Sequence, residues 1–244
     1  MGDRMARVVA LVLALALAAC GGGTSAEPSS PATTCAAGAG TCLGTVRLAL
    51  HDADDAPLAS VAVSVCGDEL CLRDRTDARG ELAIDVARRL SRPVVTVYGG
   101  SRWPTLARAI AREGDVDLGV AKLPSLAEDG PAALGDGTKL PSAIVMAGAA
   151  PSLVDPAARL DVVVAIEPGD RLSAPATLVL SNVAGWPGCA SVDVLANGLA
   201  NDPSCADGAW CPIATAHVTP DGTAIRCEAC LLAPGPLGLR RVSE

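Results

Sequence analysis

The sequence predicts an all-β protein, with two antiparallel β-sandwich domains that follow a signal peptide and a flexible tether. Three observations support this prediction. Apolar and β-branched residues alternate with polar ones in short runs over residues 44–244. Turns rich in Asp, Gly and Pro separate these runs, as in antiparallel sheets. A short apolar segment and then a Gly-, Ser-, Thr-, Pro- and Ala-rich stretch precede them, which is the composition of an export signal and a spacer.

Residues 1–19 contain the parts of an export signal peptide. Arg4 and Arg7 supply a positively charged start, and an uninterrupted apolar run follows over residues 8–16. The apolar segment is shorter than the about 20 residues that a membrane-spanning helix needs. We therefore expect export followed by removal of this segment.

The segment ends in Leu17-Ala18-Ala19-Cys20, and Gly21 follows. These residues resemble the lipobox of bacterial lipoproteins, in which the signal peptide is cut before a cysteine that then carries the lipid. The resemblance implies acylation of Cys20, a location in the bacterial cell envelope, and attachment to a membrane. Gly21 favours the outer membrane. The alternative is an ordinary secreted protein in which Cys20 stays a thiol.

Residues 20–43 are expected to form a flexible tether. A segment of small and polar residues buries too little apolar surface to offset its conformational entropy. Cys35 and Cys42 lie near its end, around a short Ala- and Gly-rich loop. They predict a small disulfide loop.

Composition and charge disfavour several classes of partner. The net charge of −8 repels nucleic acid and the anionic lipids of a membrane. The acyl chains expected on Cys20 would therefore have to anchor the protein alone. The chain has no Phe, one Tyr and three Trp, which leaves few aromatic platforms and a core of Val, Leu, Ile and Ala. Arginines between Arg73 and Arg112 form a local basic excess. A solvated face explains them, and an acidic partner is the alternative.

Residues 44–122 are expected to form the first sandwich. Apolar positions repeat with a period of two in three segments, and residues 94–98 add a fourth β-branched run. Residues 101–112 fit either a helical face or an irregular strand, and residues 117–120 fit a closing strand. The alternating positions are Val46, Leu48 and Leu50, then Val61, Val63 and Val65, then Leu82, Ile84 and Val86.

Two elements of this domain carry a resemblance to a known family. The Pro-Leu…Val-x-Val element at residues 57–63 and the turn Thr76-Asp77-x-x-Gly80 are similar to those of carboxypeptidase regulatory-like domains. That family is a transthyretin-like β-sandwich without catalytic residues of its own. The resemblance implies a structural or ligand-presenting module, and it transfers no active site.

Residues 123–140 are rich in Pro and Gly and are expected to be a linker. Residues 141–244 are expected to form a second, Cys-rich β-sandwich. Its clearest strand is the apolar run over residues 160–166. A hairpin is predicted around Thr219-Pro-Asp-Gly222, because Pro, Asp and Gly favour turn geometry.

The ten cysteines predict disulfides, because exported proteins mature in an oxidising compartment. With Cys20 lipidated, an odd number remains, so one should be unpaired. Cys66 and Cys71 flank a hairpin loop, and we expect them to pair. The connectivity of the last five is left open. These are Cys189, Cys205, Cys211, Cys227 and Cys230.

No catalytic pattern stands out. His51 and His217 are isolated, and the sequence has no nucleophile elbow, His-Glu-x-x-His or phosphate loop. We expect a non-enzymatic envelope lipoprotein that presents its surface to a protein or glycan, without metal, cofactor or nucleic acid. One alternative is a solute- or carbohydrate-binding module serving an enzyme or transporter, with Trp103, Trp186 and Trp210 as candidate contacts. Another is a metal or redox enzyme that uses the C-terminal cysteines.

Overall fold

The computed structural model describes residues 35–149, 153–167, 172–198 and 205–242. Thr33–Glu244 form one compact unit. These described ranges hold fifteen strands and two three-residue 3-10 helices, which confirms the all-β class. The expected signal peptide, the expected lipidation site Cys20 and most of the expected tether lie outside them. Within the described ranges, no helix is long and apolar enough to cross a membrane.

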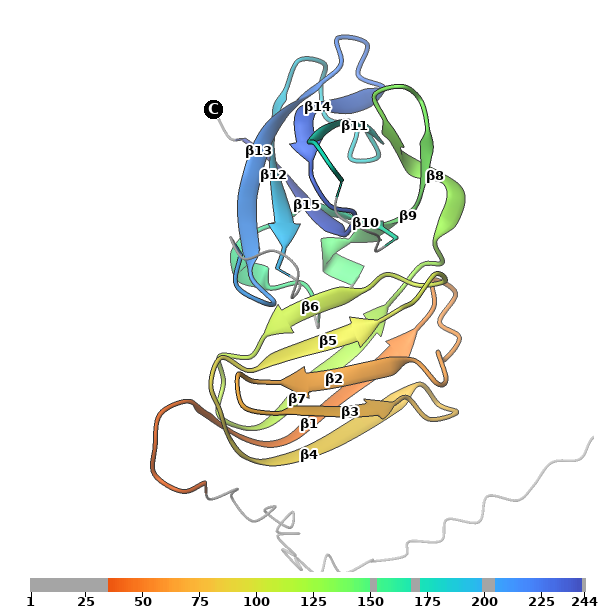
Figure 1. The fold of residues 1–244 in the computed structure, drawn as a ribbon. Coiled ribbons are helices and arrows are strands. Elements are labelled where there is room, and N and C mark those ends of the chain that lie inside the picture. Colours follow the sequence, from red (N-terminus) through yellow and green to blue (C-terminus); the bar gives the residue numbers. More distant parts are fainter. Residues whose placement is uncertain (1–34, 150–152, 168–171, 199–204, 243–244) are drawn as a thin grey trace, which may run out of the picture. The chain divides into compact units, whose positions relative to one another are not determined.

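The first domain is a β-sandwich of two sheets (Figure 1). One sheet has the strand order β4-β1-β7, and the other has the order β3-β2-β5-β6. Side chains of both sheets meet in one buried cluster of Val, Leu and Ile. The strands are β1 (Thr41–His51), β2 (Ala62–Cys66), β3 (Cys71–Arg75), β4 (Glu81–Leu90), β5 (Val94–Tyr98), β6 (Leu106–Ala109) and β7 (Gly114–Lys122).

The alternation in the sequence corresponds to the two faces of each sheet. In β4, Leu82, Ile84 and Val86 are buried and the residues between them are exposed. Strand direction differs from the prediction, because β1 pairs antiparallel with β4 but parallel with β7. Alternation reports which face of a strand is buried and does not report the direction of its neighbour. The first domain is therefore mixed rather than wholly antiparallel.

The N-terminal end of the domain lies inside the segment expected to be tether. Strand β1 begins at Thr41, and Leu43 is fully buried in the sandwich core. A disulfide joins Cys35 to Cys42, with their Cα atoms 5.8 Å apart, as the sequence predicts. Residues 41–43 of the segment expected to be tether therefore belong to the sandwich, because β1 begins there.

The Thr-Asp-x-x-Gly turn has a clear local role. The hydroxyl of Thr76 donates to the carbonyl of Leu58 at 2.5 Å and accepts from the N–H of Val61 at 3.0 Å. The carboxylate of Asp77 accepts from the N–H groups two and four residues further on, each at 2.8 Å. Gly80 takes a φ of +75°, which favours glycine. The motif joins two turns of the sandwich, and its likeness to carboxypeptidase regulatory-like domains stays a prediction.

The second half of the chain closes into an eight-stranded barrel, whereas the sequence predicts a two-sheet sandwich (Figure 1). The strand order around the barrel is β10-β15-β12-β13-β14-β11-β8-β9, and β10 closes it by pairing with β9. The strands are β8 (Ala127–Leu134), β9 (Lys139–Met146), β10 (Val162–Ile166), β11 (Ala176–Ser181), β12 (Ser191–Asn197), β13 (Trp210–Val218), β14 (Ala224–Leu231) and β15 (Pro236–Arg241). The 3-10 helices are η1 (Ala147–Ala149) and η2 (Pro156–Ala158).

The segment 123–140, expected to be a linker, holds β8 and the start of β9. Gly130 and Pro131 lie inside β8, where the pairing register with β9 shifts within residues 127–132. Such an irregularity tolerates proline, which lacks a ladder N–H. A Cβ on Gly130 would lie 2.4 Å from the carbonyl oxygen of Ser142, so glycine allows the close approach of β9. Two of the Pro and Gly residues that suggested a linker therefore belong to a bulged strand.

Strand β10 is buried on both of its faces, which explains its continuous apolar sequence. Val162, Val164 and Ile166 belong to the cluster inside the barrel. Val163 and Ala165 belong to the same buried cluster as the sandwich core. A strand covered on both faces loses alternation and reads as an unbroken apolar run.

Strand β6 ends one sheet of the sandwich, and Asn197 at the end of β12 covers its edge. Oδ1 of Asn197 accepts from the N–H of Ala107 at 2.9 Å, and Nδ2 donates to the carbonyl of Ala107 at 3.0 Å. The N–H of Ala109 donates to the carbonyl of Gly208 at 3.3 Å. A Cβ on Gly208 would lie 2.4 Å from the backbone nitrogen of Ala109. The last residue of β12 and Gly208 thus supply partners to an otherwise open strand edge.

Candidate ligand-binding site

A pocket of about 540 Å³ lies beside the paired ends of β12 and β15. This volume is within the range of small-molecule sites in proteins, about 300–1,000 Å³. Segments far apart in the sequence form its wall. The lining residues are Arg159, Asp161, Trp186, Asp193, Arg240, Arg241 and Val242.

One side of the pocket is a cross-strand ion pair. Asp193 on β12 and Arg240 on β15 face each other in the antiparallel ladder. Nε of Arg240 lies 3.0 Å from Oδ2 of Asp193, and both side chains are partly exposed. Nη1 of Arg240 also donates to the carbonyl of Ala158 at 3.4 Å. These contacts hold the carboxylate of Asp193 and the guanidinium of Arg240 in one place.

A second carboxylate is held by the backbone. Asp161 precedes β10, and its Oδ2 accepts from the N–H of Arg241 at 3.0 Å. Arg159 follows η2 in the left-handed conformation, with φ 49° and ψ 44°. That turn is stabilised by Asp155, whose carboxylate accepts from the N–H of Ala157 at 2.9 Å. The capped turn therefore places Arg159 on the wall beside Asp161.

Trp186 supplies the aromatic surface of the pocket. The residue is half-buried and packs against the cluster inside the barrel. Nδ2 of Asn182 donates to the carbonyl of Trp186 and to that of Gly222, both at 2.8 Å. Oδ1 of Asn182 accepts from the N–H of Trp186 at 3.2 Å. The amide of Asn182 therefore positions the backbone that carries the indole.

The charges of the pocket are not balanced. Three arginines and two aspartates line it, whereas the whole chain carries a net charge of −8. Arg240 is paired with Asp193. The guanidinium groups of Arg159 and Arg241 have no ion-pair or hydrogen-bond partner among the residues that the structure describes. Both residues are exposed.

The other two tryptophans do not line this pocket. Trp103 is half-buried against the sandwich core, and the guanidinium of Arg102 lies 5.1 Å from the centre of its ring. Trp210 packs against the same core cluster, and its buried indole N–H has no hydrogen-bond partner in the described part of the chain. Of the three tryptophans proposed as ligand contacts, the structure brings Trp186 alone to the pocket.

The sequence does not reveal the charged part of the pocket. The charged residues of the pocket lie at turns and near strand ends, where polar residues are common. They are Arg159, Asp161, Asp193, Arg240 and Arg241. They meet because β15 inserts between β10 and β12 in the barrel. A pairing of strands that are not consecutive in the chain carries no local sequence signal.

The two histidines do not form a site together. Nδ1 of His51 lies 3.9 Å from Oδ1 of Asp55, and Nζ of Lys122 lies 2.7 Å from the same carboxylate. The hydrogen bond from Lys122 holds the pKa of Asp55 below its ordinary value, and His51 adds a smaller effect. His217 is exposed on β13. In the described ranges, no three His, Cys, Asp or Glu side chains gather as metal ligands would.

The cysteines form short-range pairs. Cys66 and Cys71 face each other in the β2–β3 hairpin and are joined, as the sequence predicts. The pairing that the sequence leaves open is sequential: Cys205 with Cys211, and Cys227 with Cys230. Cys189 is the free cysteine among the described residues, and it is exposed.

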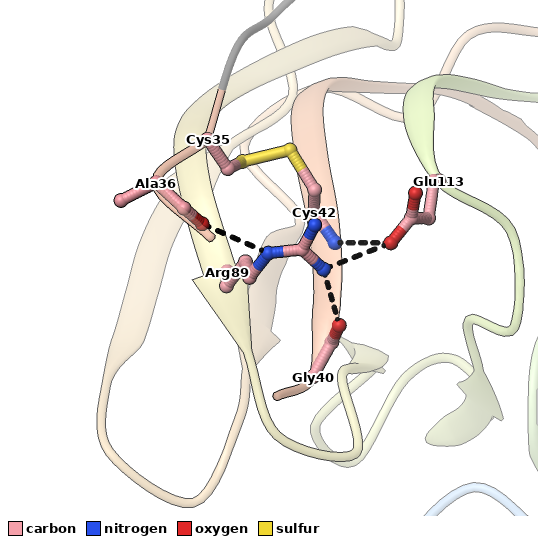
Figure 2. Close-up of polar contacts among 6 residues, drawn as sticks. All are labelled: Cys35, Ala36, Gly40, Cys42, Arg89 and Glu113. Atoms are coloured by element: carbon pink, nitrogen blue, oxygen red, sulfur yellow. Dashed lines mark hydrogen bonds and ion pairs between the residues drawn. A yellow bond between two sulfur atoms is a disulfide. The ribbon is translucent and has the colours of Figure 1, made fainter. Parts of the chain in front are cut away.

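A clamp holds the loop closed by the first disulfide (Figure 2). Nε of Arg89 donates to the carbonyl of Ala36 at 3.0 Å, and Nη1 donates to that of Gly40 at 2.7 Å. The same Nη1 lies 2.9 Å from the carboxylate of Glu113. That carboxylate also accepts from the N–H of Cys42 at 3.4 Å. The Cys42 N–H and the Arg89 guanidinium hold the pKa of Glu113 below its ordinary value.

Comparisons with known proteins assign no family. No family model matches the chain, and no curated protein matches it. One solved structure with some likeness is described as a "putative carbohydrate binding protein" from Bacteroides uniformis. The identity is 8%, the TM-score is 0.23, and the match covers 64% of this chain and 61% of that one. The match thus spans about three fifths of that protein. A likeness of this size carries no argument about fold or function.

Proposed function

We propose that this protein is an exported, lipid-anchored and non-enzymatic binding module that holds a saccharide in the barrel pocket. The observation that carries the proposal is the pocket itself, where the indole of Trp186 lies beside fixed charged side chains. A sugar ring has an apolar C–H face and a rim of hydroxyls that both donate and accept hydrogen bonds. An aromatic ring with a polar surround matches both features.

The two carboxylates suit this role because they are already positioned. Asp193 is paired with Arg240, and Asp161 accepts from the backbone N–H of Arg241. Each carboxylate oxygen that remains open is a fixed acceptor for a hydroxyl. Preorganised groups cost little ordering entropy when the ligand arrives. We propose binding and no bond-breaking step.

The clamp at the start of β1 supports an anchored arrangement. Arg89 and the Cys35–Cys42 disulfide hold the chain where it enters the sandwich. A lipid on Cys20 would then confine the domains near the membrane and raise their effective concentration for ligands there. Acylation of Cys20 is proposed because Leu17-Ala18-Ala19-Cys20 resembles a lipobox.

Saccharide binding is tested by screening labelled full-length protein against an array of bacterial-envelope and host glycans. Trp186→Ala should lose at least tenfold in affinity for every glycan that the native protein retains. Tyr98→Ala is the matched control, because Tyr98 is an exposed aromatic residue on the sandwich. The proposal fails if the native protein retains no glycan, or if both variants bind as the native protein does.

Anchoring is tested separately in a bacterial host. Native protein and Cys20→Ala are expressed with labelled palmitate, and membrane and soluble fractions are compared. The native chain should carry the label and sediment with membranes, and Cys20→Ala should carry no label. Label on the variant, or no label on either chain, would contradict lipidation at Cys20.

A further inference from the structure

We infer that the pocket selects an acidic saccharide, whose sugar carboxylate pairs with Arg159 and Arg241 while its ring lies against Trp186. This inference rests on the proposed function of the same pocket and names the class of ligand. It follows from the charges that the protein leaves uncompensated there.

The three arginines of the pocket differ in whether a carboxylate pairs with them. Arg240 is occupied, since its guanidinium pairs with Asp193 and reaches the carbonyl of Ala158. Asp161 is satisfied by the backbone N–H of Arg241 rather than by that residue's side chain. This arrangement leaves the guanidinium of Arg241 free of a carboxylate within the described structure.

Arg159 and Arg241 line the same pocket. Two like charges that share one concave surface repel each other, and an anion between them removes that repulsion. Guanidinium groups form paired hydrogen bonds with a carboxylate, which adds direction to the attraction. Arg240 and Asp193 neutralise each other, and Asp161 offsets one of the two remaining cations, so a neutral sugar would leave the pocket with a net positive charge.

An acidic sugar matches the lining of this pocket better than a free anion does. Inorganic phosphate would satisfy the two arginines but has no apolar face to place on Trp186. Trp186 is half-buried, and Asn182 holds its backbone N–H and carbonyl. A hexuronate carries a carboxylate and an apolar ring face on one small residue, so it meets both parts of the pocket.

The test is calorimetry on the full chain in detergent with three probes. These are a tetrasaccharide of glucuronic acid, the matching tetrasaccharide of glucose, and inorganic phosphate. We expect the acidic sugar to bind at least tenfold more tightly than either of the others. Its affinity should fall with added salt, because the pairing is electrostatic.

Variants assign this preference to residues. Arg159→Gln and Arg241→Gln should each reduce the affinity for the acidic sugar about tenfold and leave the affinity for the neutral sugar unchanged. Arg102→Gln is the control, because Arg102 lies on the sandwich beside Trp103. Trp186→Ala should weaken both sugars equally.

The outcomes separate the inference from the proposed function. Equal binding of the acidic and neutral sugars, lost in Trp186→Ala, would overturn the inference and leave saccharide binding in place. Phosphate binding as tight as that of the acidic sugar would overturn it in favour of a simple anion site. No binding of any saccharide would overturn both.

Discussion

The side-chain amide of Asn197 pairs with the backbone of Ala107 as a neighbouring strand would. It accepts from the N–H at 2.9 Å and donates to the carbonyl at 3.0 Å. Asn197 is buried, and its Nδ2 also donates to the carbonyl of Ala209 at 3.3 Å. One side chain at the end of a barrel strand therefore completes the hydrogen bonds of a sandwich edge.

Removal of this amide should destabilise the protein. Asn197→Ala leaves the buried N–H and carbonyl of Ala107 without partners, which costs about 1–3 kcal/mol for each such group. We expect a loss of about 2 kcal/mol or more in the free energy of unfolding, measured by urea denaturation. Ser181→Ala is the control, since Ser181 is exposed on β11. A change below about 0.5 kcal/mol in Asn197→Ala would contradict the described role of the amide.

The bulge in β8 should tolerate no side chain at Gly130. A Cβ there would lie 2.4 Å from the carbonyl oxygen of Ser142. We expect Gly130→Ala to lower the melting temperature, with a cost of about 1–3 kcal/mol from the forced shift of β9. Gly148→Ala is the matched control, because a Cβ at Gly148 meets no atom within 4 Å. Equal melting temperatures for the two variants would argue against β8 as a barrel strand.

The clamp at Glu113 should make stability depend on pH. The pKa of Glu113 is lowered by the N–H of Cys42 and by Arg89, so the folded state favours the ionised carboxylate. This contribution is present above the ordinary glutamate pKa, about 4.3, and is lost as the pH falls through the lower folded-state value. Urea denaturation of the native protein and Glu113→Gln from pH 7 to pH 3 should show a difference that shrinks on acidification. A difference that stays constant over that range would refute the clamp.

The sequential disulfides can be checked by counting thiols. In the Cys20→Ala variant, denatured without reductant, a maleimide should label one cysteine per chain, and peptide mapping should place the label on Cys189. Pairing of the described cysteines leaves that residue free. Label on Cys205 or Cys211 instead would show that the loop beside Asn197 is not closed as described.

The sequence predicts the strands well because burial alternates residue by residue. The run Leu82, Ile84 and Val86 on β4 is an example, since each buried position follows an exposed one. Pairing between distant strands is not local, so neither the parallel β1–β7 contact nor the closure of the barrel could be read from the chain. Gly130 and Pro131 were a misleading signal, because the same residues that end a strand also occur in a bulge.

Some residues of the candidate site could be proposed from the sequence, and others could not. Trp186 could be proposed because tryptophan is rare in this chain and suits ligand contact. Nothing in the sequence was a reason to propose Arg159, Asp161 and Arg241 as site residues, since polar residues at turns and strand ends usually face solvent. Only the barrel order, with β15 between β10 and β12, brings them to one wall.

The most direct test of saccharide binding at this pocket uses the indole N–H signals of the three tryptophans in a ¹⁵N-labelled sample. Assigned through single substitutions, they report separately on Trp103, Trp186 and Trp210. Titration with the glucuronic acid tetrasaccharide should shift the Trp186 signal in a saturable manner and leave the other two in place. A saturable shift of Trp103 or Trp210 with Trp186 unmoved, or no shift of any signal, would contradict the account.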